Sequence, residues 1–237
     1  MIIEAFTITY NEPRILPQYI DWYKKFVDRI TIYDDHSTDE TLEIAEKAGC
    51  RIVPFGNNDF DDRLNNEVRN NAWKDSKADW IIVGDLDEFL YCPLNLRDLL
   101  SEMKKDDIGT IIKTEGYEIM SETDVPFVFA RKGYREPHLD KVMCVRPDKI
   151  KAINFTYGGH HENPEGDVRY IPNNGIFKLL HFSGVGREVW IKKSFRYKER
   201  FCKWNYEVGA GIHHWGDLAQ KDADFTTRLN RANTFVW

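Results

Sequence analysis

The chain has 237 residues, a length that fits one large α/β domain with a sizeable core. Its 33 Lys and Arg against 39 Asp and Glu give a formal net charge of −6, which argues against a protein that binds duplex nucleic acid through a basic face. No apolar run reaches the roughly 20 residues that a membrane span needs, and four cysteines without a CxxC pair favour reduced thiols in a cytoplasmic protein over a disulfide or zinc framework.

The first ninety residues alternate between strand and helix periodicity. Apolar, β-branched runs predict strands over 2–9, 29–33, 51–55 and 80–83, and helices over 13–26, 41–48 and 64–72 lie between them. Ser37 and Glu40 have the spacing of a capping box before the second helix. Strands and helices in this order predict right-handed crossovers and a parallel sheet.

The second half is less regular. A helix is predicted over 94–105, and strands are predicted over 108–117, 141–146, 150–157 and 177–182. A loop rich in Gly, Pro and Asn covers 158–175, and the basic, aromatic segment 190–204 predicts a helix. Since the chain has no repeat or flexible linker, we expect a single domain over residues 1–237, with the regular half in 1–90 and a less regular half in 91–237.

Polar residues follow three of the four predicted strands. They are Tyr10-Asn11-Glu12, Asp34-Asp35 and Asp85-Leu86-Asp87-Glu88. Open parallel sheets bind ligands at the carboxyl ends of their strands, so six carboxylates are expected to converge there. Such a cluster calls for a cation, and Asp85-x-Asp87 can hold a hard divalent ion while leaving positions for phosphate oxygens. The alternative is a polar turn without a ligand.

Other nucleotide chemistries lack their motifs. No GxGxxG follows the first strand, and no GxxxxGK[ST] or GxSxG occurs. An aspartyl-phosphate phosphotransferase needs its DxD after the first strand, where this chain has Thr9-Tyr10-Asn11-Glu12.

Three groups of residues, in this order, resemble the family 2 nucleotide-diphospho-sugar glycosyltransferases, which have the GT-A fold. They are Tyr10-Asn11-Glu12, then Asp34-Asp35-x-Ser37-x-Asp39-x-Thr41, then Arg69-Asn70 before Asp85-x-Asp87. The match covers about residues 1–90. A weaker likeness continues through Lys141, Arg146-Pro147, His160-His161 and Leu180-His181-Phe182-Ser183. The resemblance implies a mostly parallel central sheet flanked by helices, with 1–90 binding the nucleotide-sugar and 91–237 facing the acceptor.

The resemblance also implies roles for the polar residues. Tyr10 would stack on the nucleobase between Thr9 and Glu12, and Asp35 would accept the N3–H of uracil. Arg69 would face the diphosphate, Asp85 the ribose or the metal, and Asp87 would bind Mn²⁺ or Mg²⁺ directly. Many enzymes with this fold complete the metal shell with a late histidine, and His181, at the end of an apolar strand, is the candidate, ahead of His161. Asn70 and Ser37 are interpreted as structural, and the pair His213-His214 as ordinary polar residues.

Family 2 enzymes invert the sugar anomeric carbon in one displacement, which requires a carboxylate to deprotonate the acceptor hydroxyl. Glu162 is the first candidate for this base and Asp140 the second. The basic run from Lys192 to Arg200 could meet an anionic acceptor or a membrane surface, or form a solvated helix face.

The predicted function is therefore metal-dependent transfer of a hexose from a UDP-sugar to a glycan, glycolipid or glycoprotein acceptor, without nucleic acid or a transmembrane segment. Two alternatives remain open. One is a nucleotidyltransferase that makes nucleotide-sugars, although its usual Gly-rich loop is absent after the first strand. The other is a carbohydrate-binding domain without catalysis, which would have no need of the DxD.

Overall fold

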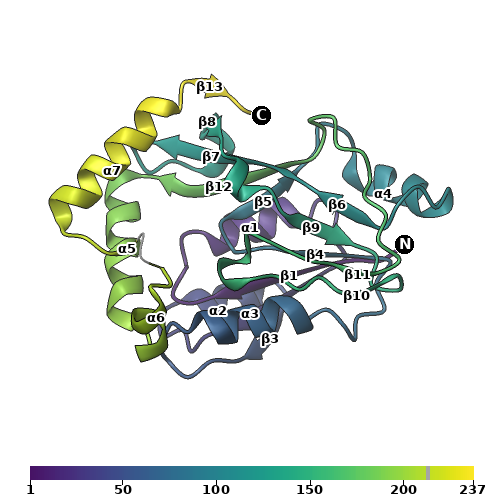
Figure 1. Cartoon of the computed structure of the whole chain (residues 1–237), viewed down its shortest axis with the longest axis horizontal. Coiled ribbons are helices and arrows are strands. Elements are labelled where there is room, and N and C mark those ends of the chain that lie inside the picture. The colour runs from purple at the N-terminus through teal and green to yellow at the C-terminus, as the bar shows by residue number, and fades with distance from the viewer. Residues whose placement is uncertain (212–213) are drawn as a thin grey trace.

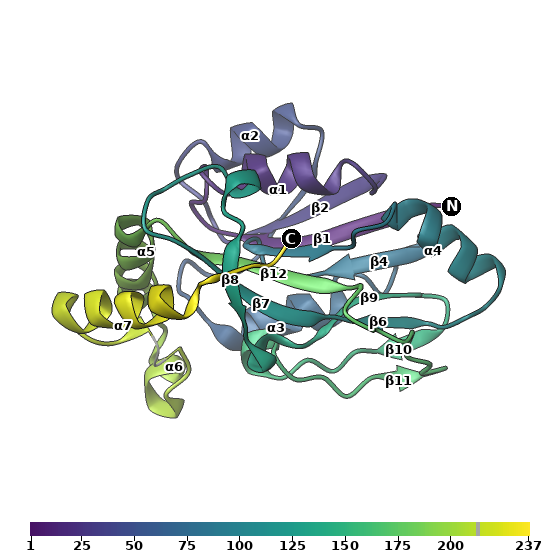
Figure 2. The same ribbon diagram turned by 90° about the horizontal axis from the view of Figure 1, so that it is seen from above.

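Parallel strands form the centre of the molecule, as the sequence predicts. The computed structural model describes residues 1–211 and 214–237 and is shown in Figures 1 and 2. Its main sheet has the order β3-β2-β1-β4-β9-β6, in which β1 pairs in parallel with both β2 and β4. The six strands are β1 (Ile3–Thr9), β2 (Arg29–Asp34), β3 (Arg51–Pro54), β4 (Trp80–Val83), β6 (Ile111–Lys113) and β9 (Val142–Val145).

Helices connect these strands at the predicted places. They are α1 (Leu16–Tyr23), α2 (Thr41–Lys47), α3 (Asp62–Asn71) and α4 (Leu96–Lys105). The capping box predicted at Ser37 is wrong, because α2 begins at Thr41 and the Ser37 hydroxyl accepts a hydrogen bond from the Asn11 backbone N–H at 2.9 Å. A contact between distant segments has replaced the local cap.

A second sheet of five strands packs beside the first, in the order β13-β8-β7-β12-β5. Its strands are β5 (Glu88–Tyr91), β7 (Glu115–Ser121), β8 (Lys132–Arg135), β12 (Lys178–Val185) and β13 (Thr234–Phe235). A small ribbon pairs β10 (Ile150–Ala152) with β11 (Glu165–Gly166), and short 3₁₀ turns cover η1 (Phe127–Phe129), η2 (Pro137–Leu139) and η3 (Tyr157–Gly159). The predicted loop over 158–175 therefore contains part of a turn and a short strand.

The strand predicted over 108–117 divides between the two sheets. Residues 111–113 pair with β9, whereas residues 115–121 pair with β12 and β8. Thr114 lies at the break and bonds to the Lys141 backbone carbonyl through its N–H (2.9 Å) and its hydroxyl (3.1 Å). A continuous apolar run predicts extended chain but does not show where the chain changes partners.

Three late helices cover the end of the molecule that lies away from the N-terminus, on the left of Figures 1 and 2. They are α5 (Arg187–Arg200), α6 (Lys203–Val208) and α7 (Leu218–Arg231). The helix predicted over 190–204 is thus two helices. It breaks where the Phe60 N–H bonds to the Arg200 carbonyl at 2.6 Å and the Cys202 N–H bonds to the Phe60 carbonyl at 3.1 Å.

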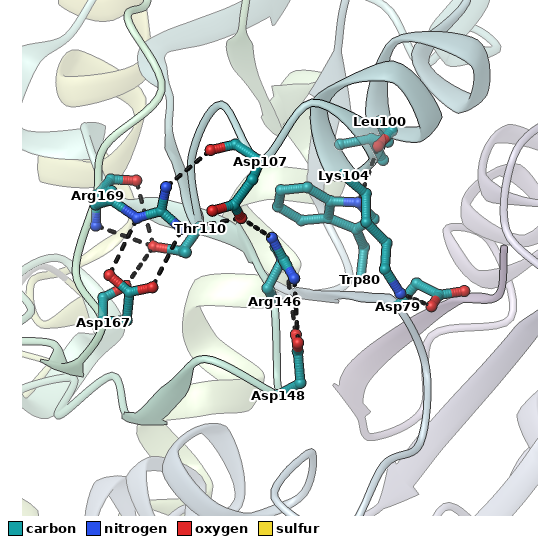
Figure 3. A network of polar contacts seen from close by, with 10 residues as sticks. All are labelled: Asp79, Trp80, Leu100, Lys104, Asp107, Thr110, Arg146, Asp148, Asp167 and Arg169. Atoms are coloured by element: carbon teal, nitrogen blue, oxygen red, sulfur yellow. Dashed lines mark hydrogen bonds and ion pairs between the residues drawn. The ribbon is translucent and has the colours of Figure 1, made fainter.

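Arg146 belongs to a polar network at the opposite end of the main sheet. Its guanidinium donates to Asp107 at 2.6 Å and to Asp148 at 3.1 Å, and Asp107 also accepts from Arg169 at 3.0 Å (Figure 3). Because β9 runs antiparallel to β4, with Val145 opposite Ile81, this network lies near the amino end of β4. Arg146 therefore stabilises the loops there and is remote from the carboxyl ends of the parallel strands.

Candidate functional site

A cleft of about 730 Å³ opens at the carboxyl ends of the parallel strands. Its lining comes from the end of the main sheet, from the second sheet and from helices α3, α5 and α7. All the residues predicted to bind the donor or the metal line this cleft: Thr9, Tyr10, Glu12, Asp35, Arg69, Asp85, Asp87 and His181. The strand ends bring most of them together, and β12 brings His181.

Asp85 is held by a side chain of α3, Arg69. The Arg69 guanidinium donates to its Oδ1 through Nε at 3.0 Å and Nη2 at 2.8 Å, while the Asp85 N–H donates to Glu88 Oε2 at 2.8 Å. Burial alone would raise the pKa of Asp85, but the positive charges of Arg69 and Lys141 outweigh it and lower the pKa. Both contacts from Arg69 use one oxygen, so they leave Oδ2 to other partners.

Arg69 comes from an unusual helix. The buried side chains of α3 are polar, namely Asp62, Asn65 and Arg69, because this face of the helix borders the cleft instead of the apolar core. Arg69 Nη1 is buried and has no hydrogen-bond partner among the described residues. A buried guanidinium with a free donor is a ready partner for an anion in the cleft.

Asp87 lies at the meeting point of the two sheets. Its Oδ2 accepts from Lys193 Nζ at 2.8 Å and lies 3.7 Å from His181 Nε2. The other ring nitrogen of His181, Nδ1, bonds to Glu118 Oε2 at 2.9 Å, and Ser183 donates to Glu118 Oε1 at 2.7 Å. Burial opposes a charged imidazole, yet the two carboxylates raise the pKa of His181 to about 9.

Asp35 and Tyr10 lie together at the far side of the cleft. Arg200 donates to Asp35 Oδ2 at 2.6 Å, and its Cζ lies 3.2 Å from the centroid of the Tyr10 ring. In the part of the chain that the structure describes, Asp35 Oδ1 is buried without a hydrogen-bond partner, and burial raises the pKa of this carboxyl group. Gly56 makes room for it, since a Cβ at Gly56 would lie 1.9 Å from Asp35 Oδ1.

Sequence reasoning missed three basic residues of α5. Lys193 contacts Asp87, Arg196 forms an ion pair with Glu12, and Arg200 contacts Asp35. These residues are spaced i, i+3 and i+7, which places them on one face of a helix. That spacing within the basic run is the sequence pattern that indicates a shared face for these three residues. The interpretation of the whole run as a solvated face is wrong for this side of α5.

The two predicted bases lie elsewhere. Glu162 pairs with Lys113 at 2.7 Å, and Asp140 pairs with Arg135 at 2.5 Å while accepting from the Gly116 N–H at 2.7 Å. Among the described residues, neither is part of the cleft lining.

The second-sheet wall of the cleft carries three other carboxylates, Glu88, Glu118 and Glu136, and Glu88 is paired with Lys141. The Glu118 carboxylate is hydrogen-bonded to His181 and Ser183. The Glu136 carboxylate is 28% exposed and has a longer contact, 3.4 Å, with Arg231.

The remaining histidines divide between the cleft and its surroundings. His160 and His214 line the cleft, and burial together with the charge of Lys141 lowers the pKa of His160 to about 3. His161 is not part of the described lining, and its ring lies 5.7 Å from that of His138. His213 lies outside the described residues.

The structural roles predicted for Asn70 and Ser37 are confirmed, because both bond to backbone groups. The Asn70 amide accepts from the Phe155 N–H at 2.7 Å and donates to the Phe155 carbonyl at 3.1 Å, and Ser37 accepts from the Asn11 N–H.

The side chains of the cleft suit a divalent metal ion that takes some of its ligands from phosphate oxygens. Within residues 1–211 and 214–237, no three His, Cys, Asp or Glu side chains are grouped closely enough to hold an ion by themselves. Asp87 and His181 nevertheless face each other, and the Glu118 bond to Nδ1 orients the imidazole as carboxylates orient metal-binding histidines. Mg²⁺-like ions are commonly held by one or two carboxylates plus substrate phosphates, and these residues fit that pattern.

Comparison with known proteins identifies a family whose model covers the strand ends that line the cleft. A family model described as glycosyl transferase family 2 matches residues 5–157, which include the three acidic strand ends. The chain belongs to glycosyltransferase family 2. An uncharacterized glycosyltransferase of Rickettsia conorii is 41% identical over 219 aligned residues, and one of Rickettsia felis is 33% identical; each alignment covers 85% of this chain and 69% of the relative.

The similar solved structures are less identical in sequence to this family 2 chain than the Rickettsia relatives are. S. aureus TarS is 15% identical with a TM-score of 0.46, over 96% of this chain and 71% of that one. Glucosyl-3-phosphoglycerate synthase from Mycobacterium tuberculosis, solved with Mn²⁺ and UDP, is 18% identical with a TM-score of 0.34, over 48% of this chain and 43% of that one. In the described part of the present chain, no helix is both long and apolar enough to cross a bilayer.

Proposed function

We propose that this family 2 glycosyltransferase transfers a hexose from a UDP-sugar to a hydroxyl group of a glycan, glycolipid or glycoprotein, with inversion, in the cytoplasm. The observation that supports it is the convergence of eight predicted residues on one cleft. Asp35 and Tyr10 would hold the nucleobase, and the Asp85-x-Asp87 motif would face the diphosphate. Residues 1–90 would bind the donor, and residues 91–237 would supply the acceptor wall.

The donor's uracil would stack on Tyr10 and donate its N3–H to Asp35. Arg200 now makes both contacts, so it would move aside or stack on the other face of the base. Thr9 and Glu12 flank the same pocket, and the buried, unpaired Nη1 of Arg69 would donate to the diphosphate. Each of these contacts uses a group that the structure already holds in the cleft.

Asp87 and His181 would hold Mn²⁺ or Mg²⁺, with Asp85 contributing its free oxygen to the ion or to the ribose. The bound ion would offset the negative charge that develops on the departing diphosphate. His181 must lose a proton before Nε2 can bind an ion, because the neighbouring carboxylates raise its pKa to about 9. Glu118 keeps the imidazole oriented in either state.

For the general base we propose Glu136 in place of Glu162 and Asp140. The base must reach the acceptor hydroxyl from within the cleft, and both earlier candidates are paired outside the lining. Glu136 lies on the acceptor wall, and its single long contact with Arg231 leaves the carboxylate accessible.

Membership of family 2 favours glycosyl transfer over the two alternatives, a nucleotidyltransferase and a non-catalytic carbohydrate-binding domain. Calorimetry tests the proposal. UDP should bind in the presence of Mn²⁺, UTP should bind no more tightly, and free hexose should bind weakly. Asp87→Ala should abolish Mn²⁺-dependent UDP binding, whereas Asp124→Ala, which removes a half-exposed carboxylate outside the described lining, should not. Equal Mn²⁺-dependent binding by Asp87→Ala would exclude Asp87 as a ligand.

A further inference from the structure

Lys193 contacts the DxD motif through the Asp87 oxygen that faces His181. Its ammonium lies 2.8 Å from Asp87 Oδ2 and 3.8 Å from Glu12 Oε1, and the side chain is only 15% exposed. The Asp87 oxygen that it contacts is the one facing His181 Nε2 at 3.7 Å. An ion shared by Asp87 and His181 must therefore replace Lys193 at that oxygen.

A displaced Lys193 needs a new anionic partner. A buried ammonium without a counter-charge is strongly unfavourable, and the nearest alternative, Glu12, already forms an ion pair with Arg196. The Asp85 carboxylate is likewise engaged by Arg69 through Oδ1. Glu12 is thus already shared with Arg196, and the second oxygen of Asp85, which Arg69 leaves open, would go to the ion or to the ribose.

A diphosphate would supply the new anionic partner. A divalent ion with so few protein ligands takes the rest of its shell from phosphate oxygens, so the ion and the anion arrive at the same place. Arg69 lines the same cleft, and its buried Nη1, which has no hydrogen-bond partner among the described residues, is a further donor for an anion.

We propose that Lys193 couples metal binding to donor binding by exchanging Asp87 for the donor's diphosphate. This inference rests on the proposed function and adds a positioning residue to it. Without nucleotide, Lys193 competes with the ion for Asp87; with nucleotide, it holds the diphosphate. Metal and nucleotide should thus bind cooperatively, and the same coupling must appear whichever of the two is added first.

Lys193→Met separates the two effects because it removes the charge and keeps the apolar stem. Binding of Mn²⁺ alone should become about three- to tenfold tighter, since the competing cation is gone. Binding of UDP with saturating Mn²⁺ should become about tenfold or more weaker, since a charged hydrogen bond to the diphosphate is lost. Uridine, which has no phosphate, should bind the variant and the wild type equally.

Lys192→Met is the matched control. Lys192 is the adjacent residue of α5, its side chain is 80% exposed, and it pairs only at 3.8 Å with Glu188. The Lys192→Met variant should leave the affinities for Mn²⁺, for UDP with Mn²⁺ and for uridine unchanged. Lys193→Arg, which keeps the charge, should retain cooperativity, and it serves as the second variant if Lys193→Met does not give a native circular dichroism spectrum.

The outcomes distinguish this inference from the proposed function. Opposite changes for Mn²⁺ and for UDP with Mn²⁺ in Lys193→Met support the inference. If Lys193→Met does not fold, Lys193→Gln takes its place as the uncharged variant, and lost cooperativity in Lys193→Gln with retained cooperativity in Lys193→Arg supports the inference equally. If the wild type binds UDP with Mn²⁺ but the uncharged variant, Lys193→Met or Lys193→Gln in its place, shows wild-type cooperativity, the inference is overturned and the proposed function stands. If the wild type binds UDP neither with nor without Mn²⁺, both are overturned.

Discussion

The pair of Lys141 and Glu88 should be the most sensitive electrostatic contact beneath the site. Lys141 Nζ lies 2.5 Å from Glu88 Oε2, and both side chains are 1% exposed. The same Glu88 oxygen accepts the Asp85 N–H at 2.8 Å, so this pair supports the backbone of the DxD motif. Replacing Lys141 with Met would leave Glu88 with that single N–H as its remaining partner among these contacts.

Removing one member of a buried ion pair costs about 3–5 kcal/mol, because the other charge is left in a poorly solvated place. We therefore expect Lys141→Met to lower the free energy of unfolding by about that amount. The double variant Lys141→Met with Glu88→Gln should be more stable than Lys141→Met alone, since the uncompensated charge is gone and Gln can still accept the Asp85 N–H.

Urea denaturation followed by tryptophan fluorescence measures both effects, since Trp73 and Trp80 are buried. Lys47→Met is the control: its i,i+4 pair with Glu43 is exposed, with side chains 74% and 61% accessible, and its loss should cost at most about 0.5 kcal/mol. The reasoning is refuted if Lys141→Met unfolds within about 1 kcal/mol of the wild type, a cost typical of an exposed pair.

Three further predictions concern single residues of the site. The pKa of His181 is raised from 6.5 to about 9, so its contacts with Glu118 should stabilise the metal-free protein fully below pH 6.5 and be lost as the pH rises through 9. Urea titrations at each pH should show a loss of about 3 kcal/mol in the wild type and none in His181→Gln, and an equal loss in both proteins would contradict this role of His181. Gly56→Ala should destabilise the fold by more than Gly49→Ala in thermal unfolding, because both glycines have positive φ (+81° and +71°) but only the Gly56 Cβ meets a neighbour, Asp35; equal costs would show that Asp35 can move. Asp35→Asn should weaken UDP binding by about 1–3 kcal/mol in calorimetry, and an equal loss for ADP would argue against recognition of uracil.

The first half of the chain could be predicted well, because its information is local. Alternating periodicities gave the β1–β4 strands, and the rule that ligands bind at the carboxyl ends of parallel strands placed Asp35, Asp85 and Asp87 in one cleft. These residues lie directly after strands, so their position depends only on strand boundaries and sheet order.

The rest of the site depends on long-range contacts that no local pattern contains. Lys193 meets Asp87 across 106 positions of sequence, and Arg200 meets Asp35 across 165. A basic helix has the same composition whether its charges face water or a cluster of carboxylates. Glu162 was misleading for a related reason: a carboxylate in a polar loop looks available until its partner, Lys113, is known.

Hydrolysis of nucleotide-sugars shows whether the cleft uses a UDP-sugar with a metal ion held by Asp87. The protein is incubated with Mn²⁺ and a panel of UDP-, GDP- and dTDP-sugars without acceptor, and the released nucleoside diphosphate and the anomeric form of the sugar are followed by NMR. We predict that the wild type releases UDP from UDP-glucose or UDP-galactose with inversion, and that Asp87→Ala does not. Turnover of GDP- or dTDP-sugars in preference to UDP-sugars, or wild-type release of UDP by Asp87→Ala, would contradict it.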